Sequence, residues 1–271
     1  YCGHSEPAYE RCPQCGGIMK HIGTGTQKVE EELHALFPGA KVLRMDTDTV
    51  GASHGHEKLL RQFEEEKIPI LLGTQMVAKG LDFENVTLVG VLCADASLYI
   101  DNYRAPERTF SLLSQVVGRA GRGSKQGRAI IQTFTPENEV IRAAAAQDYD
   151  AFYESEIRMR RLRRYPPFAD LFSFTVTGAD ESRVIRAAKA LRDALGYAVE
   201  RREELKPLSI EVLGPAGASV VKVNNRYRYR VFLVGKGCPA LRRLVAEYLY
   251  AFYQHKENRG LDIFADCNAI Q

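Results

Sequence analysis

The residues with the clearest chemical potential form one arginine-bearing string, Gln115-Val116-Val117-Gly118-Arg119-Ala120-Gly121-Arg122. Its two arginines are three residues apart, and each follows a glycine that lets backbone or ligand approach closely. A guanidinium grips two phosphate oxygens at once, and one placed on a γ-phosphate can act as an arginine finger. An isolated Gly-Arg pair at a helix end would instead complement the helix dipole. The complete string favours phosphate binding.

A second polar string follows an apolar run of strand length. It reads Gly73-Thr74-Gln75-Met76-Val77-Ala78-Lys79-Gly80-Leu81-Asp82-Phe83. Ligands of open α/β sheets bind at the carboxyl ends of strands, and we expect this string at such an end. Thr74 and Gln75 can contact backbone phosphates, and Lys79 beside Gly80 offers a charge next to accessible backbone. Asp82 can accept a hydrogen bond from ribose, or it can simply cap a helix in an ordinary strand-turn-helix.

Cysteine spacing indicates metal chemistry near the start of the chain. Cys12 and Cys15 form a C-x-x-C pair of the zinc-knuckle type, and Cys2 has the look of the end of another pair. A structural zinc takes four ligands, so we expect the partner of Cys2 to precede residue 1. A redox pair is the alternative, although thioredoxin-like context is lacking. His4 can substitute as a ligand, and the three other cysteines are expected to be core or incidental thiols.

Two segments of different periodicity must position these groups. From residue 20 to 146, near-continuous apolar strands alternate with helices, which predicts a parallel sheet with helices on both faces. We expect strands at 41–45, 68–72, 86–92 and 128–133, and helices through 29–37, 59–63 and 110–117.

From residue 147 to 271 the pattern is that of a smaller α+β domain. A charged helix over 150–164 is stopped by Tyr165-Pro166-Pro167. Strands are expected at 171–177, 210–213, 220–223, 227–234 and 261–264, with helices at 181–200 and 241–253. Asn224-Asn225 is a hairpin turn candidate. The order β-α-β-β-α-β is the split-βαβ class.

Positive charge is concentrated in the second half of the chain. The net charge is +3, yet residues 146–271 hold 21 Lys and Arg against 16 Asp and Glu. Such an excess attracts a polyanion, although it can also be solvated surface charge. Strand alternation puts Arg226, Arg228 and Arg230 on one face and Tyr227 and Tyr229 on the other. The arginine face suits phosphates, whereas the tyrosines stack bases or, more readily, face the core.

Length and composition limit the number of domains and the class of protein. The chain has 271 residues, which suggests two domains, and its 45% hydrophobic share is that of an ordinary globular protein. No window approaches 18 uninterrupted apolar residues, which excludes a membrane-spanning helix. The sequence begins at Tyr1 without a signal-peptide pattern, and we expect it to be cut from a longer protein.

Together the two strings resemble motifs V and VI of superfamily 2 helicases, and their surroundings resemble the primosomal protein N′ (PriA) family of replication-restart helicases. The further similar strings are Gly23-Thr24-Gly25-Thr26-Gln27, Arg44-Met45-Asp46, residues 103–110, Tyr165-Pro166-Pro167-Phe168, Gly214-Pro215 and residues 225–230. The resemblance covers essentially all 271 residues.

This resemblance implies the C-terminal half of an ATP-dependent 3′-to-5′ DNA helicase that restarts stalled replication forks by assembling the primosome. It implies a partial zinc-binding segment (1–19), a RecA-like second helicase lobe (20–146) and a C-terminal DNA- and partner-binding domain (147–271). The implied partners are forked and single-stranded DNA, a single-stranded-DNA-binding protein and other primosome proteins. The implied location is the cytoplasm, at the nucleoid.

The resemblance also implies roles for individual residues. Arg119 and Arg122 would be catalytic, acting on the γ-phosphate across the lobe interface, from an open cleft. ATP with Mg²⁺ would meet Gln115, Gly118, Gly80 and Asp82, and DNA would meet Thr74, Gln75, Lys79, Arg226, Arg228 and Arg230. Cys2, Cys12 and Cys15 would belong to two interleaved zinc sites.

One departure from the family limits what this chain can do alone. Neither G-x-x-x-x-G-K-[ST] nor D-E-x-H occurs here, because the family carries both motifs in its first lobe. We therefore expect the isolated chain to lack ATPase activity. The alternative is a non-enzymatic nucleic-acid-binding or assembly module, and an ATPase assay separates the two.

Overall fold

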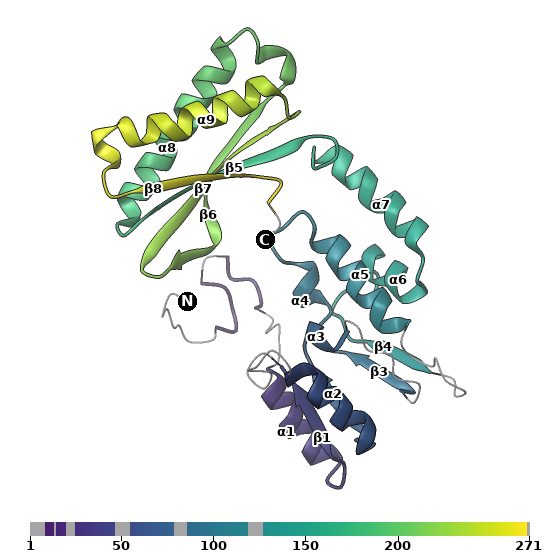
Figure 1. Cartoon of the computed structure of the whole chain (residues 1–271). Helices are drawn as coiled ribbons and strands as arrows, with labels where there is room; N and C mark the ends of the chain where they lie inside the picture. The colour runs from purple at the N-terminus through teal and green to yellow at the C-terminus, as the bar shows by residue number, and fades with distance from the viewer. Residues whose placement is uncertain are drawn as a thin grey trace. The chain divides into compact units, whose positions relative to one another are not determined.

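The structure is a computed structural model that describes residues 9–13, 15–19, 25–46, 55–78, 86–118 and 127–269. The described chain forms two compact units, residues 9–156 and residues from 157 onward (Figure 1). The predicted three-part division at residues 19 and 146 stays a prediction. None of the described helices combines the length and apolar character needed to cross a membrane.

Parallel strand pairs and helices make up the first unit (Figure 1). β1 (Val42–Met45) pairs with β2 (Ile70–Gly73), and β3 (Leu88–Val91) pairs with β4 (Arg128–Ile131). The helices are α1 (Thr26–Leu36), α2 (Gly55–Glu65), α3 (Gln75–Ala78), α4 (Asp95–Leu98), α5 (Ala105–Val117) and α6 (Glu139–Ala146). This confirms the predicted parallel α/β class. The short helices α3, α4 and α6 were not predicted.

The strands in the described part of this unit are less buried than their near-continuous apolar sequences suggest. β2 is half-buried throughout, and β3 and β4 alternate between exposed and half-buried residues. The alternation arises because Val91 and Ile131 pack against the core beside α5, whereas Leu88 and Ile130, at 59% and 55% exposure, point the other way. Here Phe110 of α5 stacks on Phe152 with ring centroids 4.2 Å apart.

The second unit confirms the predicted split-βαβ arrangement. After α7 (Tyr149–Leu162), which crosses the boundary between the units, the chain forms one four-stranded antiparallel sheet of order β6-β7-β5-β8. Its elements are β5 (Asp170–Gly178), α8 (Glu181–Arg201), β6 (Glu211–Val223), β7 (Arg226–Gly235), α9 (Pro239–Gln254) and β8 (Asp262–Cys267). Short 3₁₀ helices occupy Lys206–Leu208 and Lys256–Asn258.

One face of this sheet forms the core with α8 and α9. Phe174, Val176, Val231 and Leu233 have no exposed surface there. Strands 210–213 and 220–223, predicted as separate, are one irregular strand, β6. Its register against β7 shifts twice, and Pro215, which has no N–H, lies in the first shift.

The predicted Asn224-Asn225 turn is confirmed, with φ angles of 49° and 60° that match a type I′ hairpin turn.

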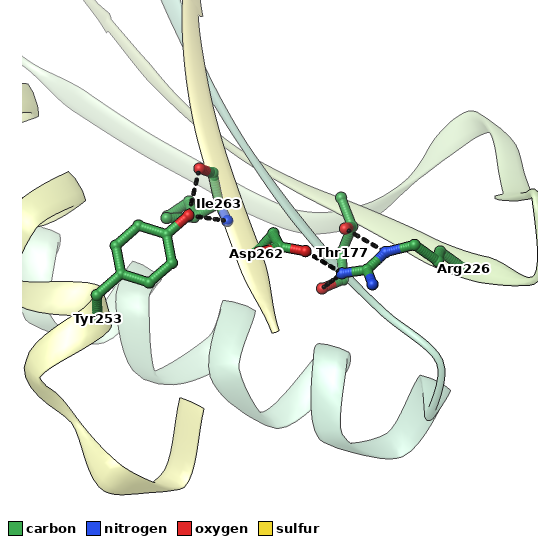
Figure 2. Close-up of polar contacts among 5 residues, drawn as sticks. All are labelled: Thr177, Arg226, Tyr253, Asp262 and Ile263. Carbon is green, nitrogen blue, oxygen red and sulfur yellow. Dashed lines mark hydrogen bonds and ion pairs between the residues drawn. The ribbon is translucent and has the colours of Figure 1, made fainter. Parts of the chain in front are cut away.

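The outer edge of β8 is capped by a tyrosine. The Tyr253 hydroxyl at the end of α9 donates to the Ile263 carbonyl and accepts from the Ile263 N–H, both at 3.2 Å (Figure 2). β8 is the last strand of the sheet, and these two backbone groups of Ile263 bond Tyr253 rather than β5, so they belong to the free edge. The hydroxyl satisfies edge groups that would otherwise be open to pairing with another chain.

We expect Tyr253→Phe to lower the free energy of unfolding by about 1 kcal/mol, because two hydrogen bonds are lost at a partly exposed edge. Hydrogen exchange of the Ile263 amide should accelerate. Tyr250→Phe is the matched control, since Tyr250 lies on the same helix at 72% exposure. Equal exchange rates in the two variants would contradict a role of Tyr253 in protecting the edge.

Candidate nucleotide and nucleic-acid interfaces

The polar string after β2 begins at a constrained turn. In the parallel pairing Met45 lies opposite Gly73, so β1 and β2 end together. A Cβ on Gly73 would lie 2.1 Å from Val77 Cγ2 and 2.5 Å from the Met45 carbonyl oxygen, so only glycine fits. Thr74 and Gln75 follow immediately and are exposed. Lys79, Gly80 and Asp82 lie outside the described residues. The described part of the string is therefore accessible at the carboxyl edge of the pair.

A polar network fixes the end of β1 beside this turn. Thr26 Oγ1, in the first turn of α1, donates to Asp46 Oδ2 at 2.7 Å. Arg44 Nε lies 3.1 Å from the same oxygen, and Arg44 Nη1 lies 2.8 Å from Glu30 Oε2. The network ties α1 to β1. The sequence singled out the strings that contain Thr26, Arg44 and Asp46 but gave no role to Glu30, because Glu30 lies on α1 and its partner Arg44 lies on β1.

The arginine string starts from a closely packed helix end. Gly118 N–H donates to the Ser114 carbonyl at 3.0 Å, and so does Gln147 Nε2 at 3.2 Å. A Cβ on Gly118 would lie 2.8 Å from Gln147 Nε2, so glycine allows this close approach. Gln115 is exposed one turn earlier. Arg119 and Arg122, with the open cleft expected for them, lie outside the described residues.

A buried carboxylate joins two segments that flank α5, the helix that ends at the arginine string. Asp95, 1% exposed, accepts hydrogen bonds from Thr133 Oγ1 at 3.0 Å, Phe134 N–H at 2.9 Å and Thr135 Oγ1 at 2.9 Å. Burial alone would raise the pKa of Asp95, but these hydrogen bonds to the ionised form outweigh it, and the pKa lies below its ordinary value. Asp95 thereby joins the start of α4 to the segment after β4. The sequence gave no signal for this residue.

The C-x-x-C pair lies on a tight turn. Cys12 N–H donates to the Gly17 carbonyl at 2.8 Å, and Gly16 N–H donates to the Cys12 carbonyl at 2.9 Å. Gly16 has a φ of 70°, which favours glycine. Among the residues that the structure describes, no three potential ligands gather to hold a metal. Cys2 and His4 lie outside the described residues, and the turn itself carries two thiols.

The arginine face of β7 is only partly available to a ligand. Arg226 Nε donates to Thr177 Oγ1 at 3.2 Å, and its Nη2 bonds both the Thr177 carbonyl and the Asp262 carboxylate (Figure 2). Arg230 is 8% exposed. Arg228 is half-buried, and its side chain makes no hydrogen bond or ion pair with another residue of the described chain. It is therefore the arginine of this face best placed to meet a phosphate.

The tyrosines of β7 face the core, which is one of the two roles that the sequence left open for them. Both Tyr227 and Tyr229 pack against the cluster under α8 and α9. The Tyr229 hydroxyl donates to Glu181 Oε1 at 2.8 Å. This hydrogen bond to the carboxylate, followed by burial, raises the pKa of Tyr229. Both rings therefore contribute to the core.

Two family models match the chain in sequence. The helicase conserved C-terminal domain matches residues 22–124, and the primosomal protein N C-terminal domain matches residues 161–268. Gly73, Thr74, Gln75 and Gly118 fall in the first match, and Arg226, Arg228 and Arg230 fall in the second.

Curated relatives extend the similarity across both units. The replication restart protein PriA of Bacillus subtilis is 42% identical over 269 residues, which is 99% of this chain and 32% of that protein. The same-named protein of Synechocystis is 40% identical over 86% of this chain and 27% of its own length. That of Treponema pallidum is 38% identical over 93% of this chain and 37% of its own length. The chain thus spans about a third of the length of these relatives.

Proposed function

Because the chain belongs to the family of the replication restart protein PriA, we propose that it is the C-terminal part of an ATP-dependent 3′-to-5′ DNA helicase that reloads the replication machinery at stalled forks. The full-length protein would use ATP and Mg²⁺, work in the cytoplasm at the nucleoid, and bind a single-stranded-DNA-binding protein and other primosome proteins. This chain alone would lack ATPase activity, because the family carries its Walker motifs in the first lobe.

The register of β1 against β2 carries the DNA-gripping part of the proposal. It brings Thr74 and Gln75 to the carboxyl edge of the strands, exposed and beside a turn that only glycine allows. Ligands of open α/β sheets bind at this edge. Thr74 and Gln75, with Lys79, would hold phosphates of the translocated strand.

The arginine string would bind ATP and act on its γ-phosphate. Gln115 and Gly118, with Gly80 and Asp82, would contact the nucleotide, and Arg119 and Arg122 would reach the γ-phosphate. A guanidinium there stabilises charge that develops on the phosphate oxygens in the transition state. The close packing of Gly118 on Gln147 supports this role, since it fixes the helix end from which the two arginines continue.

Zinc is the metal that the cysteines fit best. Two thiols on one glycine-containing turn match half of a tetrahedral structural site. Cys12 and Cys15 would hold one zinc with two ligands from the rest of the protein, and Cys2 would belong to a second zinc. Bound zinc would stabilise the fold of this segment and supply no step of the reaction.

The second unit would bind DNA without sequence preference through the arginine face of β7. Phosphate contacts give an affinity that falls as salt rises. We expect the Arg226→Ala/Arg228→Ala/Arg230→Ala variant to bind all oligonucleotide sequences more weakly and to flatten the salt slope by up to about three contacts. Arg228→Ala alone should flatten the salt slope by about one phosphate contact. Arg228 is chosen because Arg226, unlike Arg228, is already paired with Asp262.

The measurement is fluorescence anisotropy of labelled oligonucleotides with the 271-residue chain across a salt series. Arg186→Ala, an exposed arginine on α8, is the matched control. A triple variant that binds like the wild type at every salt concentration would remove this face from the DNA site. The charge would then be solvated surface or an interlobe contact.

A further inference from the structure

After its first residue, Glu211, the β6–β7 hairpin carries positive charge only. Residues 212–235 contain no Asp or Glu, and their four charged side chains are Lys222, Arg226, Arg228 and Arg230. Residues 157–169, ahead of the sheet, also hold five arginines and no Asp or Glu, whereas acidic and basic residues are mixed in the rest of the unit. Within the sheet, the hairpin is therefore the part with the strongest attraction for a polyanion.

A wide bulge interrupts the hairpin near its tip. Gly217 faces Tyr229 and Lys222 faces Tyr227, so that four residues of β6, 218–221, lie opposite the single residue Arg228. Within the bulge Ala218 is buried, whereas Val220 and Val221 are 42% and 37% exposed. A Cβ on Gly217 would lie 3.0 Å from Val221 Cγ2, so Val221 folds closely over that glycine. The bulge presents two adjacent, partly exposed apolar side chains near the tip of the hairpin.

Cations flank the two valines from both faces of the hairpin. Lys222 is the direct cross-strand neighbour of Tyr227, and its Nζ lies 4.8 Å from the centre of that ring. Tyr227 packs on the helix side of the sheet. Arg228 is the next residue along β7, so its side chain belongs to the opposite face.

We propose that this bulge is a wedge for the junction between duplex and single-stranded DNA. The last base pair at a fork exposes flat apolar ring faces, and the two phosphate backbones diverge on either side of it. Val220 and Val221 would pack on the base pair, as apolar side chains do when they part base steps. Lys222 and Arg228 would each hold one of the diverging strands.

The same features disfavour an extended peptide as the occupant. A peptide that adds to an edge strand needs a regular row of backbone groups, and bulges remove that regularity. β6 has two register shifts within 13 residues. The wedge rests on the proposed DNA binding and names the DNA structure that the second unit would recognise.

The test compares a labelled fork with a single-stranded oligonucleotide, using the 271-residue chain. We expect Val220→Ser/Val221→Ser to weaken fork binding about tenfold and to change single-strand binding less than about twofold, because only the fork offers an apolar base-pair face. Lys222→Ala/Arg228→Ala should weaken both. Leu213→Ser is the matched control, since Leu213 is 42% exposed on β6 outside this bulge. Far-UV circular dichroism checks that every variant is folded.

A second measurement uses the full-length protein. The serine variant should unwind forks more slowly while its ATP turnover on single-stranded DNA stays unchanged. If the wild-type chain binds no DNA, the proposed DNA binding of this unit fails. If it binds DNA and the serine variant binds and unwinds forks like the wild type, the wedge alone is overturned. Loss of binding to a partner protein, with fork binding intact, would make the bulge a protein contact and would also overturn the wedge.

Discussion

Arg122→Ala in the full-length protein is expected to lower ATP turnover by about 1,000-fold or more, the usual cost of losing an arginine that stabilises phosphoryl-transfer charge. The affinity for ATP should change far less, because the charge that Arg122 would meet develops in the transition state. Arg122→Lys should not restore turnover, since an ammonium cannot grip two oxygens with a planar fork. Steady-state ATPase assays with single-stranded DNA present, together with nucleotide binding, measure both effects.

Arg128→Ala is the control for this experiment. Arg128 is exposed on β4, in the same unit, and its side chain makes no ion pair with another described residue. That variant should turn over ATP like the wild type. If Arg122→Ala also kept turnover within a few-fold of wild type, the arginine string would have a structural role at the helix end, and the proposed catalytic role would be lost.

Asp95→Ala is expected to lower the free energy of unfolding of the first unit by about 3 kcal/mol. The substitution leaves two hydroxyls and one backbone N–H without the buried acceptor that they share. The chain contains no tryptophan. Hydrogen exchange measured by mass spectrometry over residues 127–146 is therefore the direct probe. Asp101→Ala, an exposed carboxylate in the loop after α4, is the control and should exchange like the wild type.

The pH dependence of the same residue has a definite sign. The pKa of Asp95 is lowered from its ordinary value of 3.8, so between the two values the unfolded chain binds more protons than the folded chain. The stabilisation by ionised Asp95 is therefore complete above about pH 4 and is lost as the pH falls through the native pKa. The stability gap between wild type and Asp95→Asn should shrink in acid. A gap that widened there would contradict the hydrogen bonding described for Asp95.

Periodicity predicted most of the second unit. Alternation identified β5 and β7, helical spacing identified α8 and α9, and the Asn224-Asn225 pair located the hairpin turn. These elements form a sheet with one covered face, where side chains must alternate between core and surface. The single strand β6 could not be predicted, because its bulges break the alternation that marks a strand.

The residues of the candidate sites differ in whether the sequence indicated them. Local strings indicated Thr74, Gln75 and Gly118, because a glycine at a tight turn can be recognised within a short string of the sequence. No local string indicated Asp95 or Gln147, since each acts through partners more than 30 residues away. Likewise, the alternation of β7 placed Arg226 on the correct face, but its ion pair with Asp262 depends on β8, which is distant along the chain.

The order of strands in the second unit also sets when it can fold during synthesis. β5 lies between β7 and β8, and Phe172 pairs with Cys267, so one edge of this central strand stays open until β8 has left the ribosome. The local β6–β7 hairpin can form earlier, because its strands are joined by a two-residue turn. Until β8 emerges the nascent unit exposes an unpaired edge of β5, which makes it a substrate for chaperones and for mispairing between neighbouring chains. A ribosome that stalls before Asp262 would leave the unit in that unfinished state.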